Sequence, residues 1–430
     1  MTTTEGNITR LVDHLFRHEA GKITSVLIGV FGPQNIELAE DVVQDSLIKA
    51  LEQWQYRGIP ENPSAWLYRV AKNKALNIIN REGYQRKYES AVARLLKSEP
   101  SVESSLDHLF SEQEIQDDQL RMIFTCCHPA ISPDSQIALA LKTLCGFSIP
   151  EIAKAFLTTE ENINRRLKRA RQTIRDTNIA FEVPQGSELT KRLNTVLETI
   201  YLLFNEGYSA SKGNEIIRYE LCEEAIRLTQ IIIADKAIEH KGPVHALLAL
   251  MLINASRFKA RQDLEGNLLT LEEQDRSRWD QQMIRIGLRH LMEATNNESI
   301  GIYHILAAIA AQYSISPSYG STDWKRILSL YDSLVQLDSS PVVLLNRAIV
   351  LAKLEDTKQG LVELEKLKDI PAFRSYHLFH STQAEFFIQE GDYGKAILSL
   401  EQAIQLAPLQ AEKNLLTRKL HFCKTKHENQ

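Results

Sequence analysis

The residues best suited to chemistry with a polyanion lie between Arg165 and Arg175, where there are six basic residues and no acidic one. Such cations neutralise phosphates, and the side chains before them can bind base edges in a major groove. A solvated bundle helix would pair some of these cations with acids at i+4. We therefore expect DNA contact: base edges for Glu161, Asn162, Asn164 and Arg165, and phosphates for Arg166, Lys168, Arg169 and Arg171.

Two short helices would position these side chains. Ser148 and Glu151 form a capping box that begins the first helix, and Thr158 to Glu161 repeats the T-x-x-E pattern before the second. The second helix has an inward apolar face at spacings of four, three and four: Ile163, Leu167, Ala170 and Ile174. A capped helix, a tight turn and a basic helix predict a helix-turn-helix from Phe147 to Arg175.

A second basic helix is expected from Pro63 to Arg81, with Ser64 as its cap. Aromatic rings can stack on unpaired bases while cations bind phosphates. Burial of Trp66 in a core is the competing interpretation. The candidates for single-stranded DNA are Trp66, Tyr68, Arg69, Lys72, Asn73, Asn77, Asn80 and Arg81.

Upstream, residues 38–51 form an amphipathic pattern with an acidic and amide face made of Asp41, Gln44 and Asp45. This face could be ordinary solvent surface or a surface that binds a protein. Periodicity alone leaves both possibilities open.

Apolar residues recur at spacings of three and four almost throughout the 430 residues, so we expect an all-α chain of several domains. An acidic, serine-flanked run indicates a flexible linker. The expected parts are a helical domain at 8–90, the linker at 91–118, the helix-turn-helix domain at 119–180, a helical extension at 187–297, and helical repeats at 298–425.

The repeats have a period of about 36 residues, which resembles the tetratricopeptide pattern. Small residues and a closing proline fall at the matching positions in one copy: Ala384, Phe387, Gly391, Tyr393, Ala396, Leu400, Ala403 and Pro408. An earlier copy repeats the pattern less well. Stacked helix pairs of this kind build an extended surface for a protein partner.

Several classes of protein are disfavoured. The net charge of −5 is sorted into acidic and basic blocks, so it does not oppose DNA binding. Five cysteines without a framework favour a reducing cytoplasm, and no apolar run suits a signal peptide or a membrane span. We expect no metal at Cys126-Cys127-His128, no cofactor, and no catalysis by Glu206, Asp275, Arg276, Arg278 or His304, which lack a nucleophile–base spacing.

Taken together, three ordered motifs resemble bacterial sigma factors of the extracytoplasmic-function group. The motifs are Ala39 to Asp45, similar to region 2.2, Trp66 to Asn73, similar to regions 2.3 and 2.4, and Gly146 to Arg171, similar to region 4.2. They cover roughly residues 8 to 178. Segments near Asn205, Gln274 and Tyr303 resemble a subgroup with a large C-terminal extension ending in tetratricopeptide-like helices.

The resemblance implies two helical domains that bind core RNA polymerase and promoter DNA. The Asp41, Gln44 and Asp45 face would bind the clamp helices of the largest catalytic subunit. The Trp66 to Arg81 helix, with the loop from Arg57 to Pro63, would open and hold the −10 element, and the Thr159 to Arg171 helix would bind the −35 duplex. The extension would regulate the factor, through a possible protein partner on its repeat surface.

Two rival functions are a one-component regulator, with a helix-turn-helix and a tetratricopeptide-like sensory module, and an adaptor built on the C-terminal scaffold. The first leaves the Trp66 and Asp41 helices unexplained. The second leaves the six-cation helix unexplained. Both rivals would act without directing polymerase to a promoter.

Overall fold

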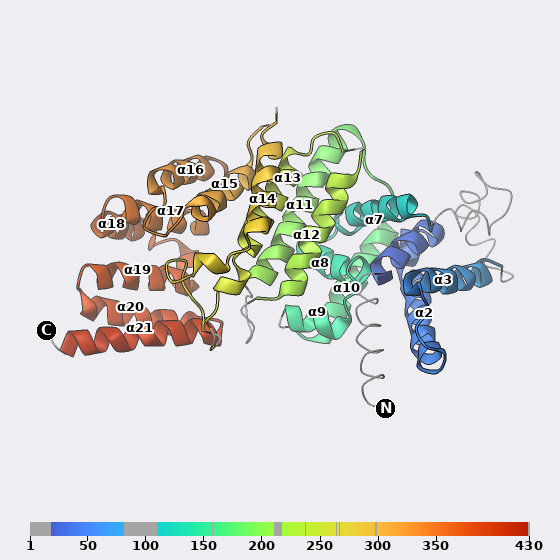
Figure 1. Ribbon diagram of the computed structural model, residues 1–430, viewed down its shortest axis with the longest axis horizontal. Helices are drawn as coiled ribbons and strands as arrows, with labels where there is room; N and C mark the ends of the chain where they lie inside the picture. The colour runs from blue at the N-terminus through green and yellow to red at the C-terminus, as the bar shows by residue number, and fades with distance from the viewer. Residues whose placement is uncertain are drawn as a thin grey trace. The chain divides into compact units, whose positions relative to one another are not determined.

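The computed structural model describes residues 19–80, 110–156, 158–209, 217–236, 238–263, 265, 267–296 and 299–428. These residues form helices throughout, apart from one isolated antiparallel bridge between Gln262 and Leu268 (Figure 1). The all-α prediction is confirmed. The chain divides into two compact units, Met1–Leu203 and Phe204–Gln430.

The first unit begins with helical residues 19–31. Its other elements are η1 (Pro33–Asn35), α2 (Ile36–Arg57), α3 (Pro63–Asn80), α7 (Glu112–Cys126), α8 (Pro133–Thr143), α9 (Ile149–Ala155), α10 (Glu160–Asp176) and the greater part of α11 (Gly186–Tyr208). Helix α2 ends at Arg57, and the following Gly58 has a φ of 77°, which glycine adopts without strain. Helix α3 is capped by Asn62, whose Oδ1 accepts the amide of Ala65 at 3.0 Å, so the prediction of Ser64 as the cap is wrong.

Segment 19–31 packs against the end of α8 within this unit. A Cβ added at Gly21 would lie 1.9 Å from the carbonyl oxygen of Leu144, so only glycine permits this approach of two backbones. Ile23, Val26 and Leu27 of the same segment are fully buried. The part before the acidic linker and the part after it therefore share one core.

Most of the acidic linker, residues 91–109, lies outside the described residues. The linker was predicted to end at residue 118. Helix α7 already begins at Glu112, seven residues before the predicted start of the next domain. Ser111 caps this helix, and acids in the first turn favour the positive end of its dipole. Asp118, expected in a solvated linker, is 2% exposed.

Burial raises the pKa of Asp118 to about 7, and this shift outweighs the opposing effect of Arg121, whose Nη1 lies 2.5 Å from Oδ1. The folded state therefore binds more protons than the unfolded state between the ordinary pKa of 3.8 and about 7. The contribution of Asp118 to stability is consequently largest at low pH and is lost as the pH rises through this window.

We expect Asp118→Asn to raise the free energy of opening of α7 at pH 8 by about 1 kcal/mol or more relative to the wild type. The two chains should differ little at pH 4.5. Hydrogen exchange of α7 peptides in the full chain measures both values. Weaker protection of the variant at pH 8 would mean that the bond to Arg121 outweighs the cost of burying the charge.

Helix α11 contains the predicted boundary at residue 187 between the helix-turn-helix domain and the extension, which stays a prediction. Its residues up to Leu203 belong to the first compact unit. The buried guanidinium of Arg192 donates to the carbonyl oxygen of Phe124 in α7, and the Thr199 hydroxyl donates to Oε1 of Gln136 in α8 at 2.9 Å. Residues 186–203 therefore complete the core around α7 and α8.

The second unit contains a group of helices followed by the part predicted to form repeats. Its first elements are α12 (Tyr219–Ala234), α13 (Gly242–Ala255), η2 (Phe258–Ala260), η3 (Arg276–Arg278) and α14 (Gln281–Ala294). Helix α13 is apolar on all sides and almost entirely buried, as expected for a helix with neighbours on several faces. It packs beside α14, as Figure 1 shows.

The repeat part consists of α15 (Ile302–Ile315), α16 (Trp324–Leu337), α17 (Pro341–Leu354), α18 (Thr357–Leu367), η4 (Pro371–Ser375), α19 (His377–Gln389), α20 (Tyr393–Leu406) and α21 (Gln410–Glu428). Helices α19, α20 and α21 lie in successive rows (Figure 1). A Cβ at Gly360 would lie 2.5 Å from that of Ala352, so this small residue brings α17 and α18 together. Assignment to the tetratricopeptide class stays a prediction.

Among the helices described, none is both long enough and apolar enough to span a membrane. The candidate metal motif is part of the core. Cys126 and Cys127 are buried, as expected for small core residues, and burial raises the pKa of the Cys127 thiol to about 12. Sγ of Cys126 lies 3.3 Å from Oγ1 of Thr143.

Candidate nucleic-acid interface

The helix-turn-helix is built by α9 and α10. The predicted capping box is present: the amide of Ser148 donates to Oε2 of Glu151 at 2.8 Å, and the amide of Glu151 donates to Oγ of Ser148 at 3.3 Å. The four predicted inward residues of α10, Ile163, Leu167, Ala170 and Ile174, are all buried. Their burial determines which face of α10 is turned to solvent.

The start of α10 differs in detail from the predicted T-x-x-E box. Thr159 rather than Thr158 is the cap, and its Oγ1 accepts the amide of Asn162 at 3.2 Å. The Asn162 side chain donates back to Oγ1 of Thr158 at 2.7 Å. An asparagine thus occupies the position predicted for glutamate, and Glu161 is left exposed one residue earlier.

The solvent face of α10 carries cations with no carboxylate at salt-bridge distance among the described residues. They are Arg165, Lys168 and Arg169, and all three are exposed, as are Glu161 and Asn164. A continuous row of unpaired cations is suited to a phosphate backbone. Asn162 is half-buried and engaged with Thr158, so it is less accessible than its neighbours.

Two of the cations expected at phosphates are engaged elsewhere. Arg166 pairs with Asp134 at the start of α8, with Nη2 2.9 Å from Oδ2. Arg171 pairs with two carboxylates of α2: its Nη1 lies 3.3 Å from Glu37 and its Nη2 lies 2.5 Å from Glu40. The structure therefore does not place Arg166 and Arg171 with the free cations of α10.

The Arg171 pair is substantially buried, with 15% of the Arg171 side chain and 16% of the Glu40 side chain exposed. Burial raises the pKa of Glu40, while the charge of Arg171 opposes that shift. Oε1 of Glu40 and Nε of Arg171 have no hydrogen-bond partner among the described atoms. Removing one of the two side chains would leave the other charge unpaired in a poorly solvated site.

Helix α3 contains the aromatic candidates, and both are partly covered. The Trp66 ring packs edge-on against Trp54 of α2, with centroids 5.4 Å apart, and its role in stacking on bases stays a prediction. The Tyr68 hydroxyl donates to Glu19, and its ring lies 5.6 Å from that of Phe110. Burial and this hydrogen bond raise the pKa of Tyr68.

The polar side of α3 is open to solvent. Arg69, Asn73 and Asn77 are exposed, and Lys72 is half-buried. The side chain of Asn80 and the whole of Arg81 lie outside the described residues. This solvent face combines hydrogen-bond donors with one exposed cation, as a nucleic-acid surface requires.

The acidic face of α2 is exposed at Asp41, Gln44 and Asp45. Oδ2 of Asp45 lies 2.8 Å from Nζ of Lys74 in α3. This ion pair joins the acidic face of α2 to the helix that carries Trp66. The Asp45 side chain stays 62% exposed in this pair.

The acids that bind α10 could not be identified from local sequence patterns. Glu37, Glu40 and Asp134 lie far from Arg166 and Arg171 in sequence, so helical i,i+4 pairing rules could not identify them. The signal that could have suggested these pairs is the row of arginines on α10 together with the acidic residues at the starts of α2 and α8.

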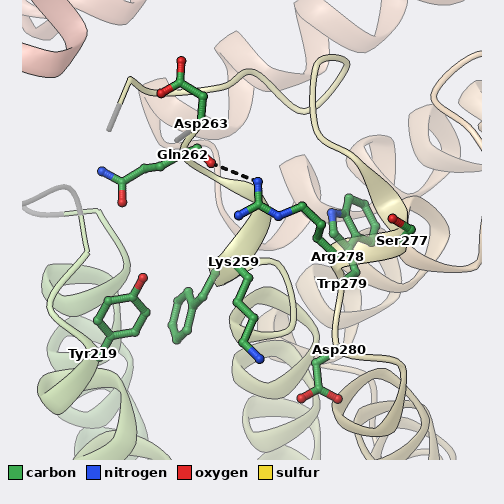
Figure 2. A pocket seen from close by; sticks show the side chains of 9 residues that line it. Tyr219, Lys259, Gln262, Asp263, Ser277, Arg278, Trp279 and Asp280 are labelled. Atoms are coloured by element: carbon green, nitrogen blue, oxygen red, sulfur yellow. Dashed lines mark hydrogen bonds between the residues drawn. The ribbon is translucent and has the colours of Figure 1, made fainter. Parts of the chain in front are cut away.

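The second unit contains a pocket of about 600 Å³ beside η2 and η3 (Figure 2). Its lining combines rings with charges of both signs: Tyr219, Phe258, Lys259, Gln262, Asp263, Ser277, Arg278, Trp279 and Asp280. Arg278 donates to the carbonyl oxygen of Gln262 at 3.3 Å. Asp280 caps α14, and the Ser277 hydroxyl donates to Asp275 at 2.7 Å as part of a cap. Among these lining residues, we find no hydroxyl activated by a histidine.

Comparison with protein families identifies three segments. Residues 15–84 match sigma-70 region 2, and residues 121–174 match sigma-70 region 4. Residues 192–295 match a family of unknown function, DUF6596.

Two relatives extend these matches. An uncharacterized protein of Rhizobium meliloti is 36% identical over 374 residues, which are 87% of each chain. An ECF RNA polymerase sigma-E factor of Haemophilus influenzae is 31% identical over 140 residues, which are 31% of this chain and 71% of that one. No solved structure matches.

Proposed function

The chain belongs to the extracytoplasmic-function group of sigma-70 RNA polymerase sigma factors, and we propose that α2, α3 and α10 divide its work. A sigma factor binds core RNA polymerase and directs it to promoters. In our proposal α10 binds the −35 element, α3 holds the −10 element, and α2 binds polymerase. The following paragraphs assign the residues.

The −35 duplex would lie along the solvent face of α10. Side chains in the first turns would contact base edges, because the start of a recognition helix lies deepest in the major groove. The later cations would bind phosphates and give the affinity a steep dependence on salt. The proposed contacts are Glu161, Asn162, Asn164, Arg165, Arg166, Lys168, Arg169 and Arg171, of which Arg166 and Arg171 must first leave their carboxylates.

The −10 element would be held as a single strand on α3 and the loop at 57–63. Flipped bases stack on aromatic rings only when they are unpaired, so binding them favours the open duplex. The half-exposed Trp66 is the leading stacking residue. The other proposed contacts are Tyr68, Arg69, Lys72, Asn73, Asn77, Asn80 and Arg81.

Polymerase would bind the acidic face of α2. Asp41, Gln44 and Asp45 are solvent-exposed and follow one another along a helix face, which suits docking on the clamp helices of the largest catalytic subunit. These roles need no bond to be made or broken by this chain, and no cofactor. They place the protein in the cytoplasm, with polymerase and the chromosome.

The observation that carries this proposal is the row of exposed cations on α10, together with the two sigma-70 matches. The test is transcription in vitro with sigma-free core polymerase on a pool of random-sequence DNA. We expect transcripts whose 5′ ends share two upstream motifs at −35 and −10. If the full chain directs no promoter-specific transcript, the proposal is wrong. A one-component regulator would bind duplex DNA but would yield no such transcripts.

The C-terminal unit would regulate the factor through a protein partner on the surface of α16 to α21. A chain ended at Ser209 keeps α11, which completes the first unit through Arg192 and Thr199. Phe204→Ser and Tyr208→Ser would make its newly exposed end polar. We expect this chain to bind polymerase like the full chain but to differ several-fold in transcript yield. Equal yields, with equal binding, would remove the regulatory role.

A further inference from the structure

We propose that the pocket beside η2 and η3 binds a small molecule that carries both an aromatic ring and several negative charges, such as a nucleoside diphosphate. The pocket lies wholly within the second unit, and the proposed function gives it no role. One wall comes from η3, in the segment near Gln274 that resembles the subgroup with a C-terminal extension. Binding at this pocket requires neither polymerase nor promoter DNA, so it can be tested apart from the proposed function.

The first argument is a group of arginines that have no acidic partner. Arg257, Arg261 and Arg276 are half-buried, and no carboxylate of the described residues lies at salt-bridge distance from them. Arg257 donates to the Tyr208 hydroxyl at 2.7 Å, Arg261 donates to the Tyr208 carbonyl oxygen, and Arg276 donates to the carbonyl oxygen of Ser316 at 2.6 Å. Burial lowers the pKa of Arg261 and of Arg276, and the charge of Arg257 lowers both further. Three cations without a counter-charge favour an anion nearby.

Two of these arginines lie against the wall of the pocket. The guanidinium carbon of Arg276 is 4.6 Å from the ring centroid of Trp279, which lines the pocket, and that of Arg257 is 5.9 Å from it. The indole N–H of Trp279, Nε of Arg257 and Nη2 of Arg276 are buried without a hydrogen-bond partner among the described atoms. Buried donors without a partner cost free energy. An anion in the pocket would supply the negative charge that this group of side chains lacks.

Two further cations line the pocket itself. Lys259 and Arg278 are exposed, and neither has a carboxylate at salt-bridge distance among the described residues. Arg278 uses one of its donors on the carbonyl oxygen of Gln262. The acids in the lining are held by their own segments: Asp263 accepts two backbone amides, at 2.8 and 2.9 Å, and Asp280 caps α14. The cations are therefore more available to a ligand than the carboxylates are.

The second argument is the aromatic wall. Tyr219 is 44% exposed, and its ring meets that of Phe258 edge-on, with centroids 5.1 Å apart. Figure 2 shows Tyr219 on one side of the pocket and Arg278 with Trp279 on the other. The ring of a ligand can stack on this wall while its phosphates bind the cations. The volume of about 600 Å³ lies within the range of about 300–1,000 Å³ that is typical of small-molecule sites.

The test is a fluorescence titration of the full chain with N-methylanthraniloyl-ADP, which carries a ring and a diphosphate. We expect saturable binding with a Kd of about 100 μM or tighter. Unlabelled ADP should displace the probe at least about tenfold more effectively than adenosine, which lacks the anion, or inorganic pyrophosphate, which lacks the ring. Lys259→Gln with Arg278→Gln, and separately Tyr219→Ser, should each weaken binding about tenfold. All three side chains are exposed, so the fold should be kept.

The control is Lys325→Gln with Lys358→Gln, which removes the same charge from exposed positions of the second unit and should bind the probe like the wild type. The proposal is overturned if the wild type shows no saturable binding up to about 1 mM probe, or if the site variants bind like the control. Displacement by adenosine or pyrophosphate as effective as that by ADP would also overturn it, because ring and anion would then not be bound together. None of these results bears on the proposed function, which transcription tests.

Discussion

Arg165→Ala together with Arg169→Ala should weaken binding of the polymerase holoenzyme to a −35-containing promoter about 100-fold. Each side chain is exposed on α10 and has no carboxylate partner among the described residues, so the substitutions should weaken DNA binding without disturbing the fold. A good base or phosphate contact contributes about 1–3 kcal/mol. Removing two of them corresponds to roughly two orders of magnitude in affinity.

The same double variant should flatten the salt dependence of binding, by up to about one unit of slope for each phosphate that is no longer neutralised. The measurement is holoenzyme affinity for promoter DNA at several salt concentrations. Lys325→Ala with Lys358→Ala removes an equal charge from exposed positions in the second unit and should leave both affinity and slope unchanged. Equally weakened binding in the two variants would point to net charge instead of a −35 contact.

The helices could be predicted from local patterns because their causes are local. The apolar face of α10 and the Ser148–Glu151 capping box depend on residues within four positions of each other, and both are confirmed. The cap of α10 was misplaced by one residue because Thr158 and Thr159 are equally good caps in isolation.

Long-range partners could not be predicted from the same patterns. Arg171 and Glu40 are 131 positions apart, and nothing near either residue specifies the other. The start of α7 could not be predicted for a similar reason. An acidic run is typical of a solvated linker, yet Asp118 is buried against Gly29 and Arg121. Likewise, nothing near Arg192 or Thr199 in the sequence predicts their contacts with α7 and α8.

Asp41→Lys should weaken binding of the full chain to core polymerase about 30-fold or more. Asp41 is exposed on α2, so the substitution should leave the fold intact. Reversing a charge in a complementary interface replaces attraction by repulsion, which costs about 2 kcal/mol or more and is felt most at low salt. The measurement is a binding titration of labelled chain with core polymerase at two salt concentrations.

Glu355→Lys makes the same charge change at an exposed position after α17, and it should bind polymerase like the wild type. Asp45→Asn is a second comparison, because Asp45 also binds Lys74. If the face contacts polymerase directly, Asp41→Lys should weaken binding to core polymerase much more than Asp45→Asn does. If Asp41→Lys binds like the wild type, the acidic face of α2 is ordinary solvent surface.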